Sequence, residues 1–238
     1  MALKTKIAAA VCALGVVAAA GEEVRLVGGP DDLAQWRDTH NTWVTAASVK
    51  PTVALPFLLV AEPGKGLIVN GPKGRAKNLL SKQEFSDVEV HVEFLIPPRS
   101  NSGVYLMGRY EIQVYDSFGK KGDYPGIECG GIYQRWADGK GFEGHSPRVN
   151  ASKPAGEWQS FDITFRAPRF DAAGKKIAKA AFLKVVHNGQ VVHENVELTG
   201  PTRAAHYDDE RAIGPLMLQG DHGPVAYRNL VVRPLAAK

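Results

Sequence analysis

The feature that most constrains the fold is an alternating run over residues 101–116. From position 104, most even positions carry apolar side chains that suit a buried face: Val104, Leu106, Tyr110, Ile112 and Val114. Most odd positions carry aromatic or hydrogen-bonding side chains: Tyr105, Arg109, Glu111, Gln113 and Tyr115. A period of two residues is typical of half-buried β-strands. The run therefore predicts a sheet with one face in the core and one polar face.

The turn in the middle of this run sets the pairing of the two strands. A three-residue loop over 107–109, with its glycine near the bend, places Leu106 opposite Tyr110. A two-residue turn would instead place Leu106 opposite Glu111, which a sheet with one buried face does not tolerate. The sequence therefore predicts a hairpin with a three-residue loop.

The polar face of this hairpin has two interpretations. In the predicted register Tyr105 lies beside Glu111, with Gln113 one step along. Polar residues on one face of an antiparallel sheet are often only its solvated face. An aromatic ring beside a carboxylate and an amide, however, is also what a sheet needs to hold and act on a sugar.

The first twenty residues have the pattern of a secretory signal peptide. Two lysines precede an apolar stretch over 7–17, and three alanines end at position 20. This stretch is too short to span a bilayer. We therefore expect residues 1–20 to be removed together with Cys12, leaving one domain over 21–238. The mature protein is expected to be periplasmic or secreted, without membrane insertion.

Charge and cysteine content limit the expected binding partners and disulfide bonds of the protein. Removing the two lysines of the leader lowers the formal net charge from +4 to +2, with 27 basic against 25 acidic side chains left. The remaining basic residues are scattered, so a nucleic-acid partner is not expected. Cys129 becomes the sole cysteine, which excludes an intrachain disulfide. Beside two glycines, it is expected to be a small buried residue rather than a nucleophile.

Strand patterns recur along the rest of the chain, over 88–96, 161–165, 182–187, 190–193, 216–219 and 225–232. Asn188-Gly189 between two of them is a strong hairpin signal, and His187 before it is expected at the surface. The last two runs are expected to pair around 220–224. Helical periodicity is nearly absent, with a turn or two possible at 31–36 and 77–82. Many short strands with Gly/Pro turns predict an all-β jelly-roll sandwich of two antiparallel sheets.

A long glycine-rich segment over 119–150 follows the hairpin directly. It contains Tyr133 and few signs of regular structure. Segments of this kind inside a compact domain are usually functional. We expect it to form a wall of the same site as the hairpin.

No metal, nucleotide or nucleophile motif is present in the sequence. Glu111, Gln113 and Asp116 resemble in spacing the Glu-x-Asp-x-x-Glu strand of laminarinase-type glycoside hydrolases, where two carboxylates act as nucleophile and acid/base. Here an amide replaces the central carboxylate, and Asp116 falls on the other strand face unless a bulge intervenes. The pattern therefore disfavours a double-displacement hydrolase, but it remains compatible with a reaction that uses one well-placed base.

Residues 85–119 also contain two distinctive motifs, Ile-Pro-Pro-Arg-Ser-Asn-Ser-Gly-Val-Tyr-Leu and Gly-Arg-Tyr-Glu-Ile-Gln-Val-Tyr-Asp-Ser. With them the chain resembles the secreted family of 3-keto-glucoside-1,2-lyase/3-keto-2-hydroxy-glucal hydratase domains, also called 3-keto-disaccharide hydrolase. The resemblance continues through 149–158, 166–170, 187–189 and 214–234, and is looser before residue 82. Two departures from the family pattern are the inserted Gly220 and a longer loop over 126–147.

The resemblance implies a concanavalin-like jelly roll that cleaves glycosides whose C3 hydroxyl has been oxidised to a ketone. Such a ketone acidifies the C2 proton, so a base can remove it and the C1 aglycone leaves by β-elimination. Water then adds to the resulting 2-hydroxy-glucal. This chemistry needs a base, an acid for the leaving oxygen, and donors that stabilise an enolate.

Ten side chains are candidates for these tasks. Glu111 and His222 are the base and acid candidates, with Lys153 as a third catalytic group. Substrate contacts are expected from Asn101, Tyr105, Arg109, Gln113, Tyr133, Trp158 and Gln219. A divalent cation would suit the reaction by polarising the ketone and C2 oxygens, although the cofactor requirement stays open.

Two other functions remain open at this point. A non-catalytic carbohydrate-binding module on the same fold would use Tyr105, Tyr115 and Tyr133 and would not need Glu111. A laminarinase-like glycoside hydrolase would act on unoxidised sugars. The preferred anomer, the aglycone and the oligomeric state are not determined by the sequence.

Overall fold

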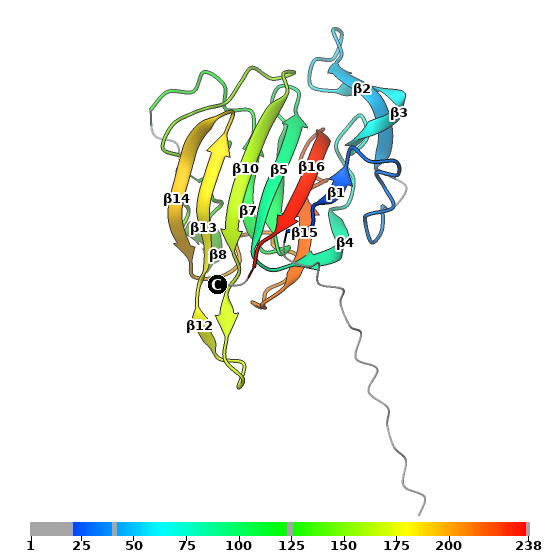
Figure 1. The fold of residues 1–238 in the computed structure, drawn as a ribbon. Helices are drawn as coiled ribbons and strands as arrows, with labels where there is room; N and C mark the ends of the chain where they lie inside the picture. Colours follow the sequence, from blue (N-terminus) through cyan, green and yellow to red (C-terminus); the bar gives the residue numbers. More distant parts are fainter. Residues whose placement is uncertain (1–20, 40–41, 123–125, 237–238) are drawn as a thin grey trace, which may run out of the picture.

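The computed structural model describes residues 21–39, 42–122 and 126–236 (Figure 1). The expected signal peptide, with Cys12, lies outside these ranges. Within them the regular structure consists of β-strands, arranged in two main antiparallel sheets. None of the described segments forms a helix that could cross a membrane.

The larger sheet spans the molecule from β14 at one edge to β2 at the other (Figure 1). Its strands, in spatial order, are β14 (Gln190–Leu198), β13 (Ala180–His187), β10 (Gln159–Arg166), β5 (Val88–Leu95), β16 (Ala226–Pro234), β3 (Leu59–Val69) and β2 (Val44–Pro51). A further strand, β1 (Val24–Val27), pairs with β16.

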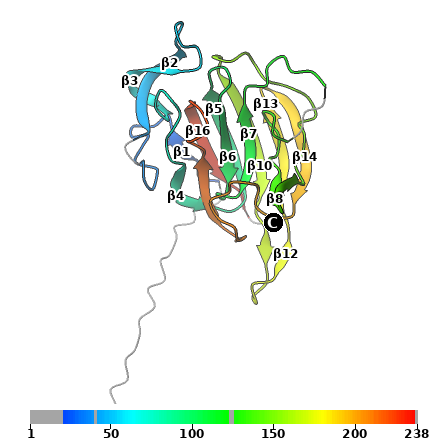
Figure 2. The same ribbon diagram turned by 180° about the vertical axis from the view of Figure 1, so that it is seen from behind.

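The smaller sheet lies behind the larger one and is seen from its own side in Figure 2. Its strands, in spatial order, are β4 (Leu79–Phe85), β15 (Gly214–Leu218), β6 (Asn101–Leu106) and β7 (Tyr110–Tyr115). Two small hairpins complete the described strands: β8 (Arg135–Ala137) with β9 (Lys140–Phe142), and β11 (Arg169–Phe170) with β12 (Lys176–Ala178).

The core lies between the two sheets and is built from the alternating apolar positions. Phe94 of β5 and Phe161 of β10 are fully buried, with ring centroids 4.8 Å apart. Val104 and Ile112 of the smaller sheet are fully buried in the same cluster. Burial of such a side chain stabilises the fold by about 1.5–3 kcal/mol. The two-sheet antiparallel sandwich predicted from the sequence is confirmed.

The predicted register of the central hairpin is also confirmed. Leu106 pairs with Tyr110, and Tyr105 pairs with Glu111. Met107 and Gly108 have φ angles of 57° and 63°, and the amide of Arg109 donates to the carbonyl of Leu106 at 3.0 Å. The even strand positions therefore enter the core, and the odd strand positions 101, 103, 105, 111 and 113 share the opposite face of the small sheet.

Three local expectations differ from the structure. Residues 79–82 belong to strand β4 rather than to a helical turn, because Leu79 and Ser81 alternate inward. β15 and β16 do not pair with each other; the segment between them crosses from the small sheet to the large one. His187 is fully buried rather than exposed, because its ring packs 4.8 Å from that of Phe161.

Candidate active site

A polar cavity of about 250 Å³ opens on the face of the small sheet that points away from the core. Most of the residues predicted for the site line it: Asn101, Tyr105, Glu111, Gln113, Tyr133, Gln219 and His222. Arg203 and Ala204 complete the lining. Three predicted residues, Arg109, Lys153 and Trp158, do not take part.

The floor of the cavity is the β6–β7 hairpin, extended by one more segment. The amide of Tyr133 donates to the carbonyl of Glu111 at 3.1 Å, and the amide of Gln113 donates to the carbonyl of Gly131 at 2.9 Å. The chain after residue 129 therefore runs beside β7 like a further strand. This pairing sets the Tyr133 side chain next to Glu111, so the glycine-rich segment contributes Tyr133 to the lining of the cavity.

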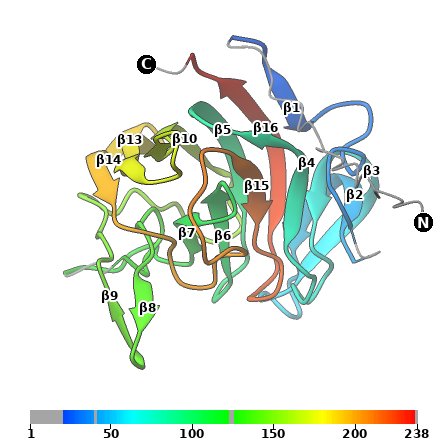
Figure 3. The ribbon, with the colours of Figure 1, turned by 90° about the horizontal axis from the view of Figure 1, so that it is seen from below.

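The roof of the cavity is the connection between β14 and β15, residues 199–213. Figure 3 shows this connection in orange, passing across β7 and β6. The amide of Thr202 donates to the carbonyl of Arg109, and the amide of His206 donates to the carbonyl of Gly108, each at 2.9 Å. These bonds attach the roof to the turn of the hairpin and bring Arg203 over the floor.

Glu111 is the buried acid of the cavity, with 2% of its surface exposed. Burial raises the pKa of its carboxyl to about 8, and the negative charge of Asp221 adds to the rise. A hydrogen bond from Tyr105 acts in the opposite direction, because it favours the ionised carboxylate. A carboxylate with such a pKa is a stronger base than an exposed one.

The hydroxyl of Tyr105 has two acceptors within reach, the Glu111 carboxylate and the carbonyl of Arg203, the latter at 3.3 Å. A hydroxyl has one proton to donate, so it serves one acceptor at a time. Ionised Glu111 is the stronger acceptor. When Glu111 is protonated, the Tyr105 hydroxyl is free to donate to Arg203. The hydrogen bonding of floor and roof therefore depends on the proton of Glu111.

His222 lies at the mouth of the cavity, on the segment between β15 and β16. Its Nδ1 is 2.6 Å from an oxygen of Asp221, which fixes the orientation of the imidazole. Half of the His222 side chain is exposed, so the ring can exchange protons with solvent. With Nδ1 held by Asp221, Nε2 is the nitrogen that can transfer a proton to or from a ligand.

Three amide side chains of the lining carry buried oxygens that have no hydrogen-bond partner in the described structure. They are Oδ1 of Asn101 and the Oε1 atoms of Gln113 and Gln219. A buried acceptor without a partner costs about 1–3 kcal/mol. Such a cost is recovered when a ligand brings donors, and sugar hydroxyls are donors of this kind.

The same oxygens are relevant to a metal ion. Within the described ranges there is no cluster of three or more His, Cys, Asp or Glu side chains that could hold one. Amide oxygens together with the Glu111 carboxylate are nevertheless the ligand type that Ca²⁺ and Mg²⁺ accept. The lining therefore fits a hard divalent cation through oxygen ligands, and does not fit a metal that prefers sulfur.

Arg109 was predicted to bind substrate but instead holds the roof. It is 2% exposed, and its Nε and Nη2 donate to the carbonyl and carboxylate of Asp209 at 2.5 Å each. Nη1 donates to the carbonyl of Met107 at 2.8 Å, and the guanidinium lies 4.5 Å from the ring of Tyr207. Its donors are occupied by these groups, which is why it does not reach the cavity.

Lys153 and Trp158 lie together at the start of β10, outside the cavity. The ammonium of Lys153 donates to the carbonyl of Trp158 at 3.1 Å. The ring of Trp158 is covered by the guanidinium of Arg228 at 4.0 Å. This geometry gives neither residue a contact with the cavity lining.

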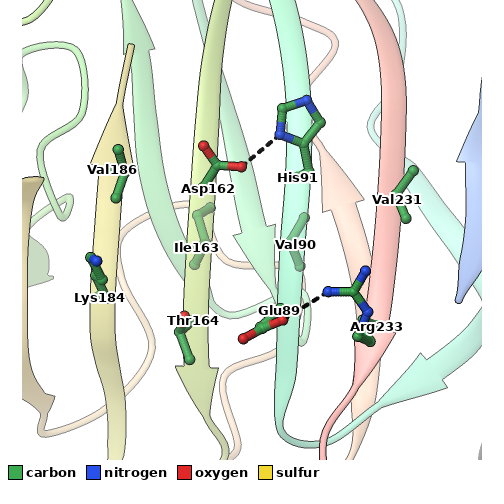
Figure 4. Close-up of a pocket in the computed structure, with 10 residues that line it drawn as sticks. All are labelled: Glu89, Val90, His91, Asp162, Ile163, Thr164, Lys184, Val186, Val231 and Arg233. Carbon is green, nitrogen blue, oxygen red and sulfur yellow. Dashed lines mark hydrogen bonds and ion pairs between the residues drawn. The ribbon is translucent and has the colours of Figure 1, made fainter. Parts of the chain in front are cut away.

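The outer face of the large sheet carries a groove of about 260 Å³. Figure 4 shows two pairs of its polar side chains interacting across the strands. His91 lies 2.6 Å from Asp162, and Arg233 donates to Glu89 at 3.0 Å. Because these four side chains are occupied by one another, we interpret the groove as part of the solvated face of the sheet.

Asp116, the third position of the laminarinase-like spacing, does not reach the cavity either. β7 ends at Tyr115, and the Asp116 carboxylate accepts the amide of Arg99 at 2.9 Å. Glu111 is therefore the carboxylate that lines the cavity, and the paired carboxylates of double displacement are not brought together.

Arg203 and Ala204 are the lining residues that sequence reasoning missed. They lie in a connection without strand periodicity, so no pattern marks them. Ala204 has a φ of 61°, which is uncommon for a residue with a side chain. The guanidinium of Arg203 stacks 3.7 Å from the ring of Trp136. Neither feature can be read from the sequence.

Together, the fold and this cavity define a β-sandwich protein with a polar cavity on the outer face of its smaller sheet. Residues 23–233 match the 3-keto-alpha-glucoside-1,2-lyase-like domain, and the chain belongs to this family of carbohydrate-active proteins. No curated protein shows significant similarity to the sequence.

Solved structures agree with this assignment. A crystal structure of a "putative glycosyl hydrolase" from Parabacteroides distasonis ATCC 8503 is 26% identical, with a TM-score of 0.64, and the match covers 90% of this chain and 84% of that one. A second structure with that name from the same organism is 17% identical, with a TM-score of 0.60 over 90% of this chain and 100% of that one. The second likeness shows the shared fold alone.

Proposed function

We propose that this protein cleaves 3-keto-glycosides by β-elimination, with Glu111 as the base. The observation that carries the proposal is the buried Glu111 carboxyl, whose pKa of about 8 suits the removal of a weakly acidic proton. Its position in a polar cavity that holds unpartnered amide oxygens supports a sugar as the ligand.

The reaction balances with the groups in the cavity. Glu111 takes the C2 proton, the C2–H electrons form the C1–C2 double bond, and the C1–O bond breaks. The leaving oxygen takes a proton from His222, whose ring is oriented by Asp221. Water can then add across the double bond at C1 to complete a net hydrolysis.

The negative charge that develops on the C3 oxygen needs stabilisation. Arg203 is the cationic side chain of the lining and would stabilise this charge. The sequence had suggested Lys153 as the catalytic cation. The amide groups of Gln113 and Gln219 face the same space and would orient the sugar. A divalent cation held by the amide oxygens and Glu111 would polarise the ketone when bound.

The test is an incubation of the purified protein with a 3-keto-disaccharide and with the same disaccharide unoxidised, followed by chromatography of the released sugars. We expect cleavage of the 3-keto sugar only. Glu111→Gln keeps the size of the side chain but removes the base, so turnover should fall by about 10² or more. Glu93→Gln is the matched control, because Glu93 pairs with Arg228 on the opposite sheet.

The other two functions give different results in this assay. A carbohydrate-binding module would cleave neither sugar and would bind with or without the Glu111 carboxylate. A direct hydrolase would cleave the unoxidised disaccharide and lose that activity in Glu111→Gln. Cleavage of 3-keto sugars that is unchanged in Glu111→Gln would contradict the proposed base.

We also propose, from residues 1–20, that the protein is exported. Mass spectrometry of the protein from the cell exterior or periplasm should give an N-terminus at or near Gly21. An intact first residue, or a lipid on Cys12, would contradict this.

A further inference from the structure

A second cavity of about 230 Å³ adjoins the first one and is not used by the chemistry above. Tyr133 lines both cavities, and Thr202 of the second is followed directly in the chain by Arg203 of the first. The hydroxyl of Thr202 accepts the amide of Glu111 at 3.2 Å. Through Thr202, the lining of the second cavity therefore contacts the backbone of Glu111, the proposed base.

The lining of this second cavity combines apolar surface with charged groups of both signs and hydroxyl groups. It consists of Tyr133, Arg135, Glu143, His145, Glu197, Leu198, Thr199, Gly200 and Thr202. Leu198 is the one residue of this lining with a purely aliphatic side chain. A sugar ring matches this mixture, because it offers hydroxyls to the carboxylate, guanidinium and hydroxyl groups and C–H faces to the apolar surface.

Arg135 of β8 is the centre of this lining. Its Nη1 donates to the hydroxyl of Thr199 at 2.7 Å and to the carboxylate of Glu143 at 3.3 Å. Its Nε is buried without a hydrogen-bond partner in the described structure. The guanidinium lies 5.1 Å from the ring centroid of Phe142, and it occupies the space that a side chain at Gly200 would take. Arg135 is thus held through Nη1, and its buried Nε is left as an unused donor.

We propose that the second cavity is the subsite for the leaving group, and that it takes a second sugar ring bound through Arg135. This rests on the proposed function, since it needs a scissile bond above Glu111. The two cavities are similar in size and share Tyr133 as a common wall. A disaccharide would lie across that wall, with its oxidised ring over Glu111 and its second ring beside Arg135.

The test compares two substrates, a 3-keto-disaccharide and a 3-keto-glucoside with a 4-nitrophenyl leaving group. In Arg135→Met, the ratio of the kcat/KM values for disaccharide over aryl glucoside should fall about tenfold or more, the scale of a lost hydrogen bond to a charged group. Lys140→Ala is the control, because Lys140 lies exposed on the same β8–β9 hairpin. It should leave the ratio as in the wild type.

A second variant covers the case in which Arg135→Met fails to fold. A Cβ at position 200 would lie 2.7 Å from Nη2 of Arg135, and Gly200 has no left-handed φ angle, so Gly200→Ala displaces the guanidinium without backbone strain. It should lower the same ratio. A ratio that stays at the wild-type value in both variants would overturn the proposal.

Failure of the proposed function would be seen separately. If the wild type cleaves neither 3-keto substrate, the reaction is wrong, and the subsite is then tested by calorimetry with unoxidised sugars. An intact subsite predicts tighter binding of a glucose disaccharide than of methyl glucoside, with the difference lost in Gly200→Ala. Equal affinity of the wild type for both sugars would refute the subsite on its own.

Discussion

The carboxylate of Glu111 fills the space that a side chain would take at Gly103: a Cβ built at position 103 would lie 2.1 Å from Oε1 of Glu111 and 2.9 Å from a ring carbon of Tyr105. Gly103 is opposite Gln113 in the ladder, two pairs along from Tyr105 and Glu111 and therefore on the same face of the sheet. The carboxylate thus leans diagonally across the hairpin. The absence of a side chain at position 103 is part of how the base is positioned.

Gly103→Ala should therefore damage catalysis more than stability. The added methyl group meets the end of a flexible side chain rather than backbone, so the sheet can form while the carboxylate is displaced. We expect kcat on 3-keto-glycosides to fall at least tenfold, since misplacement of a reacting group by about 1 Å can cost 10²-fold. Gly29→Ala is the control, because its Cβ would meet nothing closer than 4.0 Å. Equal kcat values for Gly103→Ala and wild type would show that the carboxylate position is unimportant.

The rate should rise with pH through the pKa of Glu111. A base must be ionised, so kcat/KM should increase up to an apparent pKa near 8. Tyr105→Phe removes the hydrogen bond that favours the ionised form, which raises the pKa of Glu111 further. The rising limb should therefore move to higher pH in Tyr105→Phe. A pH–rate profile of this variant that is unchanged, or shifted to lower pH, would contradict the assigned bond.

Stability should be greatest near pH 6.5. Burial lowers the pKa of His187 to about 3 and that of His193 to about 4, so below 6.5 the unfolded chain binds more protons and stability is lost as pH falls. Burial raises the pKa of Glu111 to about 8, so between 4.5 and 8 the folded chain binds the extra proton and stability is lost as pH rises. Burial also lowers the pKa of His206, so the histidines outweigh the one carboxyl below 6.5, and the carboxyl increasingly dominates above it. Each group contributes about 1.4 kcal/mol per pH unit.

Urea unfolding at pH 5, 6.5 and 8 measures this curve. In Glu111→Gln the loss between pH 6.5 and 8 should largely disappear, because the neutral amide does not titrate. A variant that loses the same stability as wild type over this interval would show that Glu111 is not the group responsible.

Arg109→Met should release the roof of the cavity. The change leaves the carbonyls of Met107 and Asp209 without their donors, at a cost of about 1–3 kcal/mol each where the group stays buried. We expect a lower free energy of unfolding and a higher KM, because the roof carries Arg203. Arg211→Ala is the control, since this exposed side chain also contacts Asp209. Equal KM values for Arg109→Met and wild type would show that the position of the roof does not affect substrate binding.

The floor of the site could be predicted from the sequence because a strand has a fixed period. Once Leu106 is placed opposite Tyr110, the positions of Tyr105, Glu111 and Gln113 on the other face follow. The same reasoning misplaced Arg109, which stands on the polar side of the alternation but lies in the turn. Its partner, Asp209, is about a hundred positions away in the chain, and no local pattern relates the two.

The roof and the second cavity could not be predicted for a related reason. Arg203 and Arg135 reach the site through loop geometry, and loops have no period that fixes which way a side chain points. The predicted pairing of the runs over 216–219 and 225–232 was wrong for a similar reason. Both were correctly predicted as strands, but a short connection can join two strands of one sheet or cross to the opposite sheet. The alternation within β15 and β16 is the same in either case.

The separate construction of floor and roof bears on how such a protein can acquire new substrates. A residue on the floor cannot be inserted or deleted without turning every following side chain to the wrong face. The connection over 199–213 has no such constraint, and lengthening a surface loop costs little in free energy. Exchange of this connection, with Thr202, Arg203 and the contact to Arg109 retained, is therefore a route to altered leaving-group preference that leaves the base and its neighbours in place.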